Sequence, residues 1–247
     1  MLEFLNQIDT SVFLFFNGMH TPFLDRFMML FTGRFIWIPM YAAILIVLLR
    51  THGVKSAGIY VLAIALAITL TDQTCATFIR PMVERLRPSN LENPLSALTI
   101  VVDDYRGGSY GFPSCHSANS FALATFMAFL FPRRRMLMFI FGWAALNSYT
   151  RLYLGVHYPG DLLVGAVIGS AFGYLCYRIA NYLDPVKNNN DGIERLSQPI
   201  FNIPIGPVWA NIGRMTITVT VGDILIAVGA VTSAIILAAS AINHTAA

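Results

Sequence analysis

The stretch "TRLYLGVHYPGDLLVGAVIGSAFGYLCYRIANY", residues 150–182, joins a polar cluster to an apolar run of bilayer length. The run, residues 161–182, supplies the ~20 mostly apolar residues that a membrane-spanning helix needs. The cluster carries Arg151, His157 and Asp161 between two long apolar stretches. Charged side chains beside such segments are costly and usually functional. The stretch therefore predicts a membrane helix with a functional site at its amino-terminal end.

The composition favours a membrane protein. Hydrophobic residues make up 56% and charged residues 12% of the chain, whereas a soluble domain carries about 25% charged residues. A net charge of +3 and one short basic run, residues 133–135, give no reason to expect a nucleic-acid partner. Cys75, Cys115 and Cys176 lie far apart, and they show neither a disulfide framework nor zinc-ligand spacing.

The apolar segments predict an all-α, polytopic membrane protein with one domain over residues 1–247. Its core, residues 28–182, is expected to contain five spans, and a polar linker over residues 183–216 is expected to lead to a sixth. The expected spans are 28–49, 57–78, 117–131, 136–153, 161–182 and 217–242.

The amino-terminal segment, residues 1–22, is expected to form an amphipathic helix along the membrane surface. Its apolar residues recur at helical spacing. They are Leu2, Leu5, Ile8, Val12 and Phe15. The segment also carries acidic residues where a signal peptide would have a basic region, so we do not expect a signal peptide.

Six spans would place the connecting loops alternately on two faces of the membrane. Face A would hold the amino terminus, the loops 80–116 and 151–161 and the carboxyl terminus, with seven Lys and Arg residues against nine on face B. Only four remain on face A when Arg80, Arg87 and Arg151 are set aside as site residues. Because positive loops stay in the cytoplasm, face A is expected outside the cytoplasm, on a bacterial plasma (inner) membrane.

Three polar clusters would meet on face A and form a phosphate site. They are "RPMVERLRP" (80–88), "FPSCHS" (112–117) and the opening stretch. Arginines from the first and third clusters, Arg80, Arg87 and Arg151, offer planar donor forks that match phosphate oxygens.

The second cluster adds backbone donors to the phosphate site. Ser114, with the backbone N–H groups of Cys115 and His116, begins a helix. A helix amino terminus attracts anions.

Two histidines would flank the phosphate. One can attack phosphorus while the other protonates the leaving oxygen. They are His116 and His157, and Asp161 can orient one imidazole. Pro159 fits the first position of a helix, so His157 is expected just outside the fifth span and Asp161 in its first turn.

The three clusters resemble the signature of the type 2 phosphatidic acid phosphatase superfamily over residues 25–180. That signature is Lys-x6-Arg-Pro, Pro-Ser-Gly-His and Ser-Arg-x5-His-x3-Asp, and order, spacing and span placement agree. The resemblance implies that the enzyme needs no metal or other cofactor. It also implies that His157 is the nucleophile of a phosphohistidine mechanism, His116 the general acid and Asp161 the residue that holds His157. The phosphate ligands it implies are Arg80, Arg87, Ser114, Cys115 and Arg151.

Three positions depart from the family pattern. Arg80 replaces lysine, which keeps the charge but widens the donor fork. Cys115 replaces glycine, which is strained if that position needs a positive φ and tolerable if only its N–H matters. Thr150 replaces serine, a mild change.

The resemblance implies an integral membrane lipid phosphatase that acts on a lipid in the bilayer, with no obligate protein partner. Undecaprenyl diphosphate, lipid A phosphate, phosphatidylglycerophosphate and phosphatidic acid are the candidate substrates. A channel or transporter with an anion site is the alternative, although the charges gather at one face. A second alternative is a metal-dependent hydrolase with His116, His157 and Asp161 as ligands, although three arginines would oppose a dication.

The remaining polar residues have weaker interpretations. Arg34 and Arg85 are expected to extend to the interface, and Asp223 to lie there. Asp72 either lines the mouth of the site or bonds to neighbouring helices. The loop 89–112 is either a lid, in which Asp103, Asp104 and Arg106 choose the headgroup and Gly107 and Gly108 allow motion, or a flexible surface loop. The remaining histidines, His20, His52 and His244, are expected to be structural or on the surface.

Overall fold

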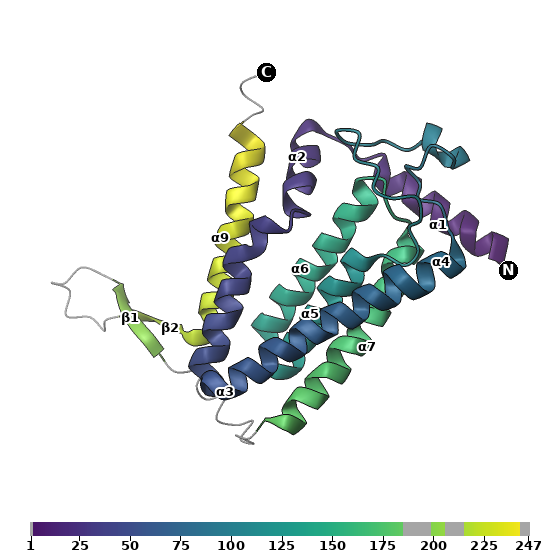
Figure 1. Ribbon diagram of the computed structural model, residues 1–247. Coiled ribbons are helices and arrows are strands. Elements are labelled where there is room, and N and C mark those ends of the chain that lie inside the picture. The colour runs from purple at the N-terminus through teal and green to yellow at the C-terminus, as the bar shows by residue number, and fades with distance from the viewer. Residues whose placement is uncertain (1, 185–198, 206–214, 243–247) are drawn as a thin grey trace.

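The computed structural model describes residues 2–184, 199–205 and 215–242 (Figure 1). The secondary-structure elements of these residues are helices apart from one β-hairpin. The helical fold class is therefore confirmed, and its all-α form needs one correction. The helices are α1 (Leu2–Asn17), α2 (Pro22–Phe31), α3 (Ile38–Gln73), α4 (Arg80–Val83), α5 (Cys115–Leu130), α6 (Arg134–Tyr153), α7 (Pro159–Leu183) and α9 (Val221–Ile242). Short helical turns are η1 (Phe35–Trp37), η2 (Thr74–Ile79) and η3 (Pro94–Ala97).

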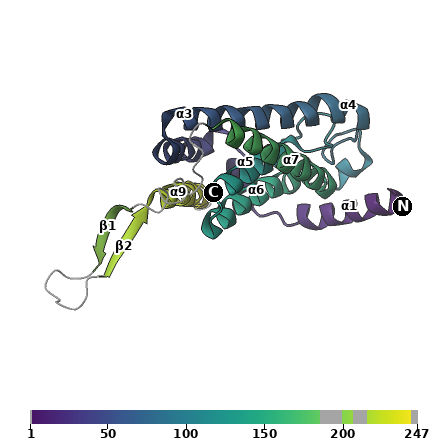
Figure 2. The same cartoon turned by 90° about the horizontal axis from the view of Figure 1, so that it is seen from below.

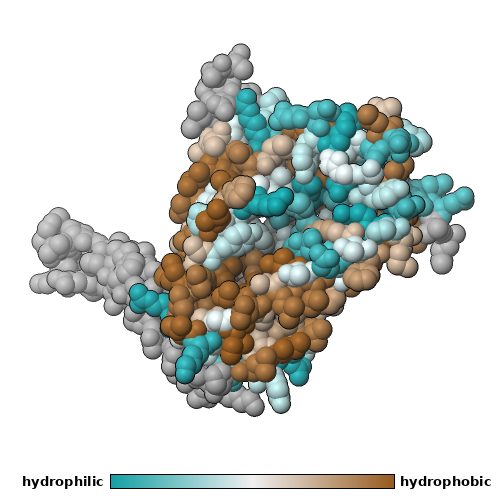
Figure 3. All heavy atoms as spheres, viewed as in Figure 1, coloured by the Kyte–Doolittle hydropathy of each residue, from teal (hydrophilic) through white to brown (hydrophobic). Residues whose placement is uncertain are grey.

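Three helical stretches of the described residues are long and apolar enough to cross a bilayer. They are Phe35–Val83, Pro159–Leu183 and Asp223–Ala241. Figure 3 shows hydrophobic residues over α3 and α9, and hydrophilic residues at the end that carries α1 and the loop after α4. These stretches support a membrane protein, whereas the count of six spans stays a prediction.

The first two predicted spans are two legs of α3. Gly53 has a φ of 75° and a ψ of 171° inside the helix, a conformation that glycine adopts without steric cost, and the chain turns back there (Figure 1). The predicted span 28–49 is wrong at its start, because α2 ends at Phe31 and α3 begins only at Ile38. Gly33 lies in this break.

Helix α5 lies at the centre of the bundle, against α3, α6 and α7 (Figure 2). It approaches α7 most closely along Gly165, Gly169 and Gly173. A Cβ on Gly165 would lie 2.5 Å from the carbonyl oxygen of Ser114, and Cβ atoms on the other two would overlap the carbonyl oxygens of Ala118 and Ala122. Small residues at four-residue spacing allow such backbone contact. The contact places the start of α5 beside the start of α7.

A hairpin replaces part of the predicted polar linker. Strand β1 (Pro199–Ile205) pairs antiparallel with β2 (Met215–Thr220). The sequence of β2, "MTITVT", is rich in β-branched residues, which favours a strand. The predicted linker over 183–216 therefore contains β1 and the start of β2, and the predicted start of the sixth span at 217 is wrong, because α9 begins at Val221. Helix α9 begins at Val221, where Asp223 accepts hydrogen bonds from the backbone N–H and the hydroxyl of Thr220. The rest of the predicted linker, residues 185–198 and 206–214, lies outside the described residues.

Helix α1 packs on the bundle through one face. Phe13 is fully buried and its ring centroid lies 5.5 Å from that of Tyr158. The predicted apolar residues Leu5, Ile8 and Phe15 are exposed instead. An exposed apolar stripe suits a membrane surface, and that placement of α1 stays a prediction.

Candidate active site

One cavity of about 950 Å³ lies between α3, α5 and α6 and reaches the loop that joins α4 to α5, residues 84–114 (the α4–α5 loop). Its polar end is lined by Arg80, Arg87, Arg151, His116 and His157. The predicted cluster residues from three separate parts of the chain therefore meet at one place. The other end is apolar and lies between the two legs of α3, beside residues such as Ile44, Leu48 and Ile64.

Two arginines hold donors ready for an anion. Arg151 donates from Nη1 to Thr32 Oγ1 over 3.0 Å and from Nη2 to the hydroxyl of Tyr105 over 2.9 Å. Arg80 donates from Nη2 to the carbonyl of Pro113 over 3.1 Å. The Nε atoms of both arginines are buried and have no partner among the described residues. Buried donors are normally paired, so these groups favour a bound anion.

Arg87 adds a third positive charge from the α4–α5 loop. Its Nε donates to the carbonyl of Tyr110 over 3.1 Å. Burial, together with the neighbouring Arg151 and Arg80, lowers the pKa of Arg87 to about 10. Burial is the main cause of this shift and repulsion between the positive charges adds to it. A phosphate bound between the arginines would relieve that repulsion.

His157 and Asp161 face each other as the spacing predicts. His157 lies in the turn before α7, and Asp161 lies in its first turn. His157 Nδ1 is 3.4 Å from Asp161 Oδ2. The same carboxylate oxygen accepts the backbone N–H of Tyr158 over 3.0 Å, which completes a capping box. Helix capping therefore holds the carboxylate in place beside the imidazole.

The surroundings of His157 disfavour the protonated form of its imidazole. Its side chain is almost fully buried. Burial first, and then Arg87, Arg151 and Arg80, hold the pKa of His157 well below its usual range. A neutral imidazole has a free lone pair. With Nδ1 turned toward Asp161, Nε2 is the atom left for the cavity.

Arg85 lies behind the carboxylate, so its predicted extension to the interface is wrong. Its Nη1 donates to Asp161 Oδ1 over 2.9 Å and its Nη2 to Asp9 Oδ2 over 2.6 Å. Its guanidinium carbon lies 3.9 Å from the ring centre of Tyr158. Asp9 of α1 also accepts the backbone N–H of Gly160 over 2.7 Å. Tertiary ion pairing thus replaces solvent exposure, and α1 joins the support of the site.

Ser114 and Cys115 begin α5. Ser114 is the fully buried N-cap residue and its Oγ accepts the backbone N–H of Ser117 over 3.4 Å. It is not among the cavity-lining residues, whereas Cys115 and His116 are. Cys115 is not one of the described residues with a positive φ, so its replacement of glycine carries no backbone strain. Its Sγ accepts a hydrogen bond from Arg80 Nη2 over 3.0 Å.

The residues that were considered for a lid do not line the cavity. Arg106 donates from Nε to Asp104 over 2.7 Å on the outer surface, and Asp103 borders a separate small pocket. Tyr105, between them, does line the cavity through its contact with Arg151. In this part of the α4–α5 loop, an aromatic residue therefore reaches the site, whereas Asp103, Asp104 and Arg106 do not.

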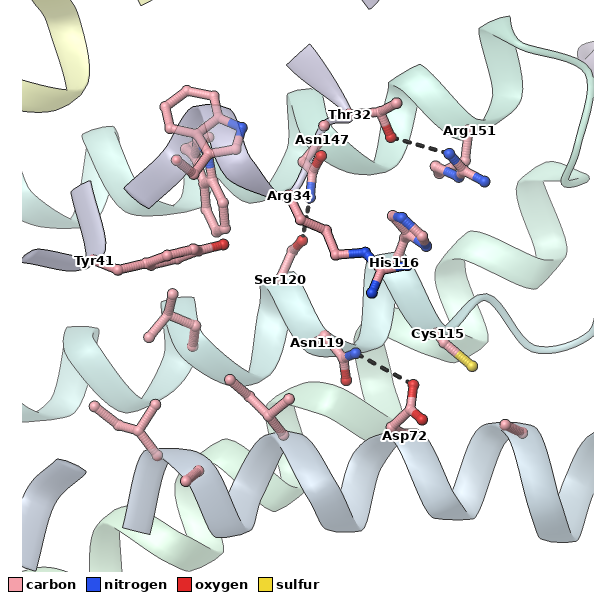
Figure 4. A pocket seen from close by; sticks show the side chains of 18 of the residues that line it. Thr32, Arg34, Tyr41, Asp72, Cys115, His116, Asn119, Ser120, Asn147 and Arg151 are labelled. Atoms are coloured by element: carbon pink, nitrogen blue, oxygen red, sulfur yellow. Dashed lines mark hydrogen bonds between the residues drawn. The ribbon is translucent and has the colours of Figure 1, made fainter. Parts of the chain in front are cut away.

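Several cavity residues were not expected from the sequence. Arg34 lines the cavity, and Figure 4 shows its side chain between Ser120 and His116, so its predicted extension to the interface is wrong. Asp72 lines the cavity and also accepts a hydrogen bond from Asn119 Nδ2 on α5 over 3.4 Å. It therefore both lines the site and bonds to a neighbouring helix. The other additions are Thr32, Asn119, Ser120 and Asn147. Asn and Ser in apolar helices were the available signal.

The other histidines are not in the cavity lining. His20 bonds to Asp25 over 2.7 Å, and the ring of His52 packs against that of Tyr60. His244 lies outside the described residues. Among the residues that the structure describes, no three His, Cys, Asp or Glu side chains form a group that could hold a metal ion.

Comparison with known proteins agrees with this geometry. A family model described as the PAP2 superfamily matches residues 56–185. The chain belongs to the PAP2 superfamily. It is 58% identical over 208 residues to the lipid A 4'-phosphatase of Bacteroides thetaiotaomicron. The aligned region covers 81% of this chain and 92% of that protein. It is 32% identical over 181 residues to the lipid A 4'-phosphatase of Porphyromonas gingivalis, with 73% and 76% covered.

A solved structure has a similar fold. The crystal structure of Aquifex aeolicus LpxE is 25% identical, superposes with a TM-score of 0.51, and covers 68% of this chain and 94% of that one. The PAP2 membership makes the protein a membrane-bound hydrolase of phosphoric esters. The family match therefore favours an enzyme over a channel or transporter.

Proposed function

We propose that this PAP2 enzyme hydrolyses a phosphate monoester of lipid A and releases inorganic phosphate. The observation that carries the proposal is the 58% identity to a lipid A 4'-phosphatase over 92% of its length. The cavity supports it, because a cationic end adjoins an apolar end that suits acyl chains. Undecaprenyl diphosphate, phosphatidylglycerophosphate and phosphatidic acid rank below it as substrates.

In the first step, Nε2 of His157 attacks phosphorus and forms an N–P bond. The bond from phosphorus to the sugar oxygen breaks, and His116 protonates that oxygen as it leaves. Arg80, Arg87 and Arg151 would neutralise the charge on the equatorial oxygens. The product lipid departs and leaves a phosphohistidine.

In the second step, a water molecule attacks the phosphohistidine. His116, which has just given its proton to the lipid, takes one from the water. The N–P bond breaks, its electron pair returns to His157 Nε2, and inorganic phosphate leaves. Asp161 holds the imidazole through Nδ1 in both steps, and no metal takes part.

The active site is proposed to face the periplasm. The Lys and Arg count of the loops supports this side, with fewer cations on the face of the three motifs. The α4–α5 loop, α1 and the α6–α7 turn also lie at one end of the bundle (Figure 1).

Purified enzyme in detergent tests the proposal. With EDTA present, we expect phosphate release from lipid A to exceed release from the three other lipids. After acid-free quenching, ³²P from labelled lipid A should stay on the wild-type chain as an acid-labile adduct and be absent from His157→Ala. Full activity of His157→Ala would contradict the nucleophile, and dependence on a dication would contradict the mechanism.

A further inference from the structure

We propose that a second polar layer of the cavity, built by Asn119 and Asn147, accepts hydrogen bonds from O–H and N–H groups that lie between the phosphate and the acyl chains of the substrate. The ligand class is an acylated amino sugar phosphate. This inference deepens the proposed lipid A phosphatase function and rests on it. It assigns substrate selection to two neutral amides that the catalytic motifs do not include.

The layer lies one helical turn away from the catalytic residues. Asn119 follows His116 by three positions on α5, and Asn147 precedes Arg151 by four positions on α6. Residues at these spacings share a helix face, about 4.5–6 Å apart along the axis. Both asparagines line the cavity, and Figure 4 shows them on facing helices beside His116 and Arg151.

Hydrogen bonds within the protein engage the nitrogen of each amide. Asn147 Nδ2 donates to Ser120 Oγ over 2.6 Å, and Asn119 Nδ2 lies 3.4 Å from Asp72 Oδ1. Because a carboxylate can only accept, the Asn119 amide nitrogen must face Asp72. Each NH₂ group is therefore engaged within the protein.

The two amide oxygens remain without partners. Oδ1 of Asn119 and Oδ1 of Asn147 are buried and accept no hydrogen bond from the described residues. The Asn147 residue is only 9% exposed. A buried acceptor without a partner is costly, and these two line a cavity that is large enough for a ligand. They are placed to receive donors from the substrate.

The order of the layers selects among lipid phosphates. The cavity runs from guanidinium groups, through the amides, to the apolar residues Ile44, Leu48 and Ile64. An acylated hexosamine offers ring O–H and amide N–H donors between its phosphate and its chains. A polyprenyl diphosphate offers only hydrocarbon there, and phosphatidic acid offers ester carbonyls that cannot donate. Such lipids would leave both amide oxygens unpaired.

The test compares two substrates on matched variants. Asn119→Leu and Asn147→Leu keep the side-chain size but remove the acceptor. Thr125→Val is the control, because Thr125 Oγ1 is also buried on α5 without a partner but lies outside the cavity lining. Phosphate release gives kcat/KM for lipid A and for dodecyl phosphate, which has no donor beyond its phosphate.

We expect each Leu variant to lose about tenfold or more in kcat/KM for lipid A and to stay within about twofold of wild type for dodecyl phosphate. Thr125→Val should change neither value. An equal loss on both substrates, or no loss on lipid A, would overturn the inference. A wild-type enzyme that hydrolyses dodecyl phosphate but not lipid A would overturn the proposed function along with it.

A measurement on the wild-type protein covers the case in which a variant does not fold. N-acylglucosamine 4-phosphate and dodecyl phosphate carry the same phosphate and an acyl or alkyl chain, and only the sugar offers donors. We expect kcat/KM to be at least about tenfold higher for the sugar. Equal values for the two compounds would overturn the inference without touching the phosphohistidine mechanism.

Discussion

Arg85 Nη1 donates to Oδ1 of the fully buried Asp161 carboxylate over 2.9 Å, while Oδ2 of the same carboxylate faces His157 Nδ1. The carboxylate therefore has a permanent cation on one side and the imidazole on the other. A buried carboxylate without a partner would be costly. Burial disfavours the charged form of Asp161, and the ion pair with Arg85 opposes that effect. Arg85 thereby favours the ionised carboxylate, which in the proposed mechanism holds the N–H of the imidazole.

Removal of Arg85 should slow the chemical step. In Arg85→Ala the carboxylate loses its cation and orients His157 less well, so we expect kcat to fall at least about tenfold, which corresponds to about 1.4 kcal/mol, with little change in KM. Steady-state phosphate release measures both constants. Asp9→Asn is the comparison variant, because it removes the negative charge of the outer partner of Arg85 while its amide oxygen can still accept the backbone N–H of Gly160, and its effect should be smaller. Equal effects of the two variants would contradict this role of Arg85.

The lowered pKa of His157 predicts an acid-shifted rate profile. A nucleophile must be neutral, and the folded protein keeps His157 neutral below its usual pKa. The fall of kcat/KM on the acid side should therefore occur below about pH 6.5, the usual value for histidine. Phosphate release between pH 4.5 and 8 measures it. If the acid-side fall of kcat/KM were centred above pH 6.5, the prediction would be contradicted.

The same shift predicts a change in stability with pH. Below about pH 6.5 the unfolded chain binds a proton on His157 and the folded protein does not, so the free energy of unfolding falls as the solution becomes more acidic. Thermal unfolding of the detergent-solubilised protein at pH 7.5 and pH 5 measures this fall. It should be smaller in His157→Gln, which cannot take up the proton. An identical fall in both proteins would argue against the shift.

Cys115 should make the enzyme sensitive to thiol reagents. It lines the cavity and contacts Arg80, whereas Cys75 and Cys176 are buried. N-ethylmaleimide should inactivate the wild type, and vanadate, as a phosphate analogue, should slow the inactivation. Cys115→Ala should keep activity within a few-fold and resist the reagent. The control Cys176→Ala should remain sensitive, and resistance in that variant would contradict the assignment.

The close contact of α5 and α7 should not tolerate a larger side chain. Because a Cβ on Gly169 would overlap the carbonyl oxygen of Ala118, Gly169→Val must separate the helices and should destabilise the protein by about 2–3 kcal/mol. Thermal unfolding and phosphate release should both decline. Gly142→Ala on α6, where an added Cβ would meet nothing within 4 Å, is the control and should resemble the wild type.

Local patterns of hydropathy predicted the central helices well. The expected spans 117–131, 136–153 and 161–182 each begin within two residues of α5, α6 and α7. Apolar runs and capping residues such as Ser114 are local features, so they can be recognised in the sequence without knowledge of tertiary contacts. The hairpin of β1 and β2 was missed because the linker was judged by its polar part, although Ile217 and Val219 alternate with threonines in "MTITVT".

The site was predictable where the motifs carry the chemistry, and less so where tertiary contacts decide. The spacing of His157 and Asp161 indicated their contact, because both lie at one helix start. The role of Arg85 depends on Asp9, which is distant in the sequence. The place of Asn147 in the cavity could not be predicted, because it depends on α5 facing α6, and a local sequence pattern does not indicate which helices face each other.

The contacts of Asp9 connect α1 to the residues around His157. Asp9 touches Arg85 and the backbone of Gly160, and through them the carboxylate that holds His157. Loss of α1 would therefore be expected to lower catalytic activity through the loss of these contacts. A detergent that dissociates α1 from the rest of the protein would lower the reactivity of His157. The choice of detergent would therefore affect the measured rate.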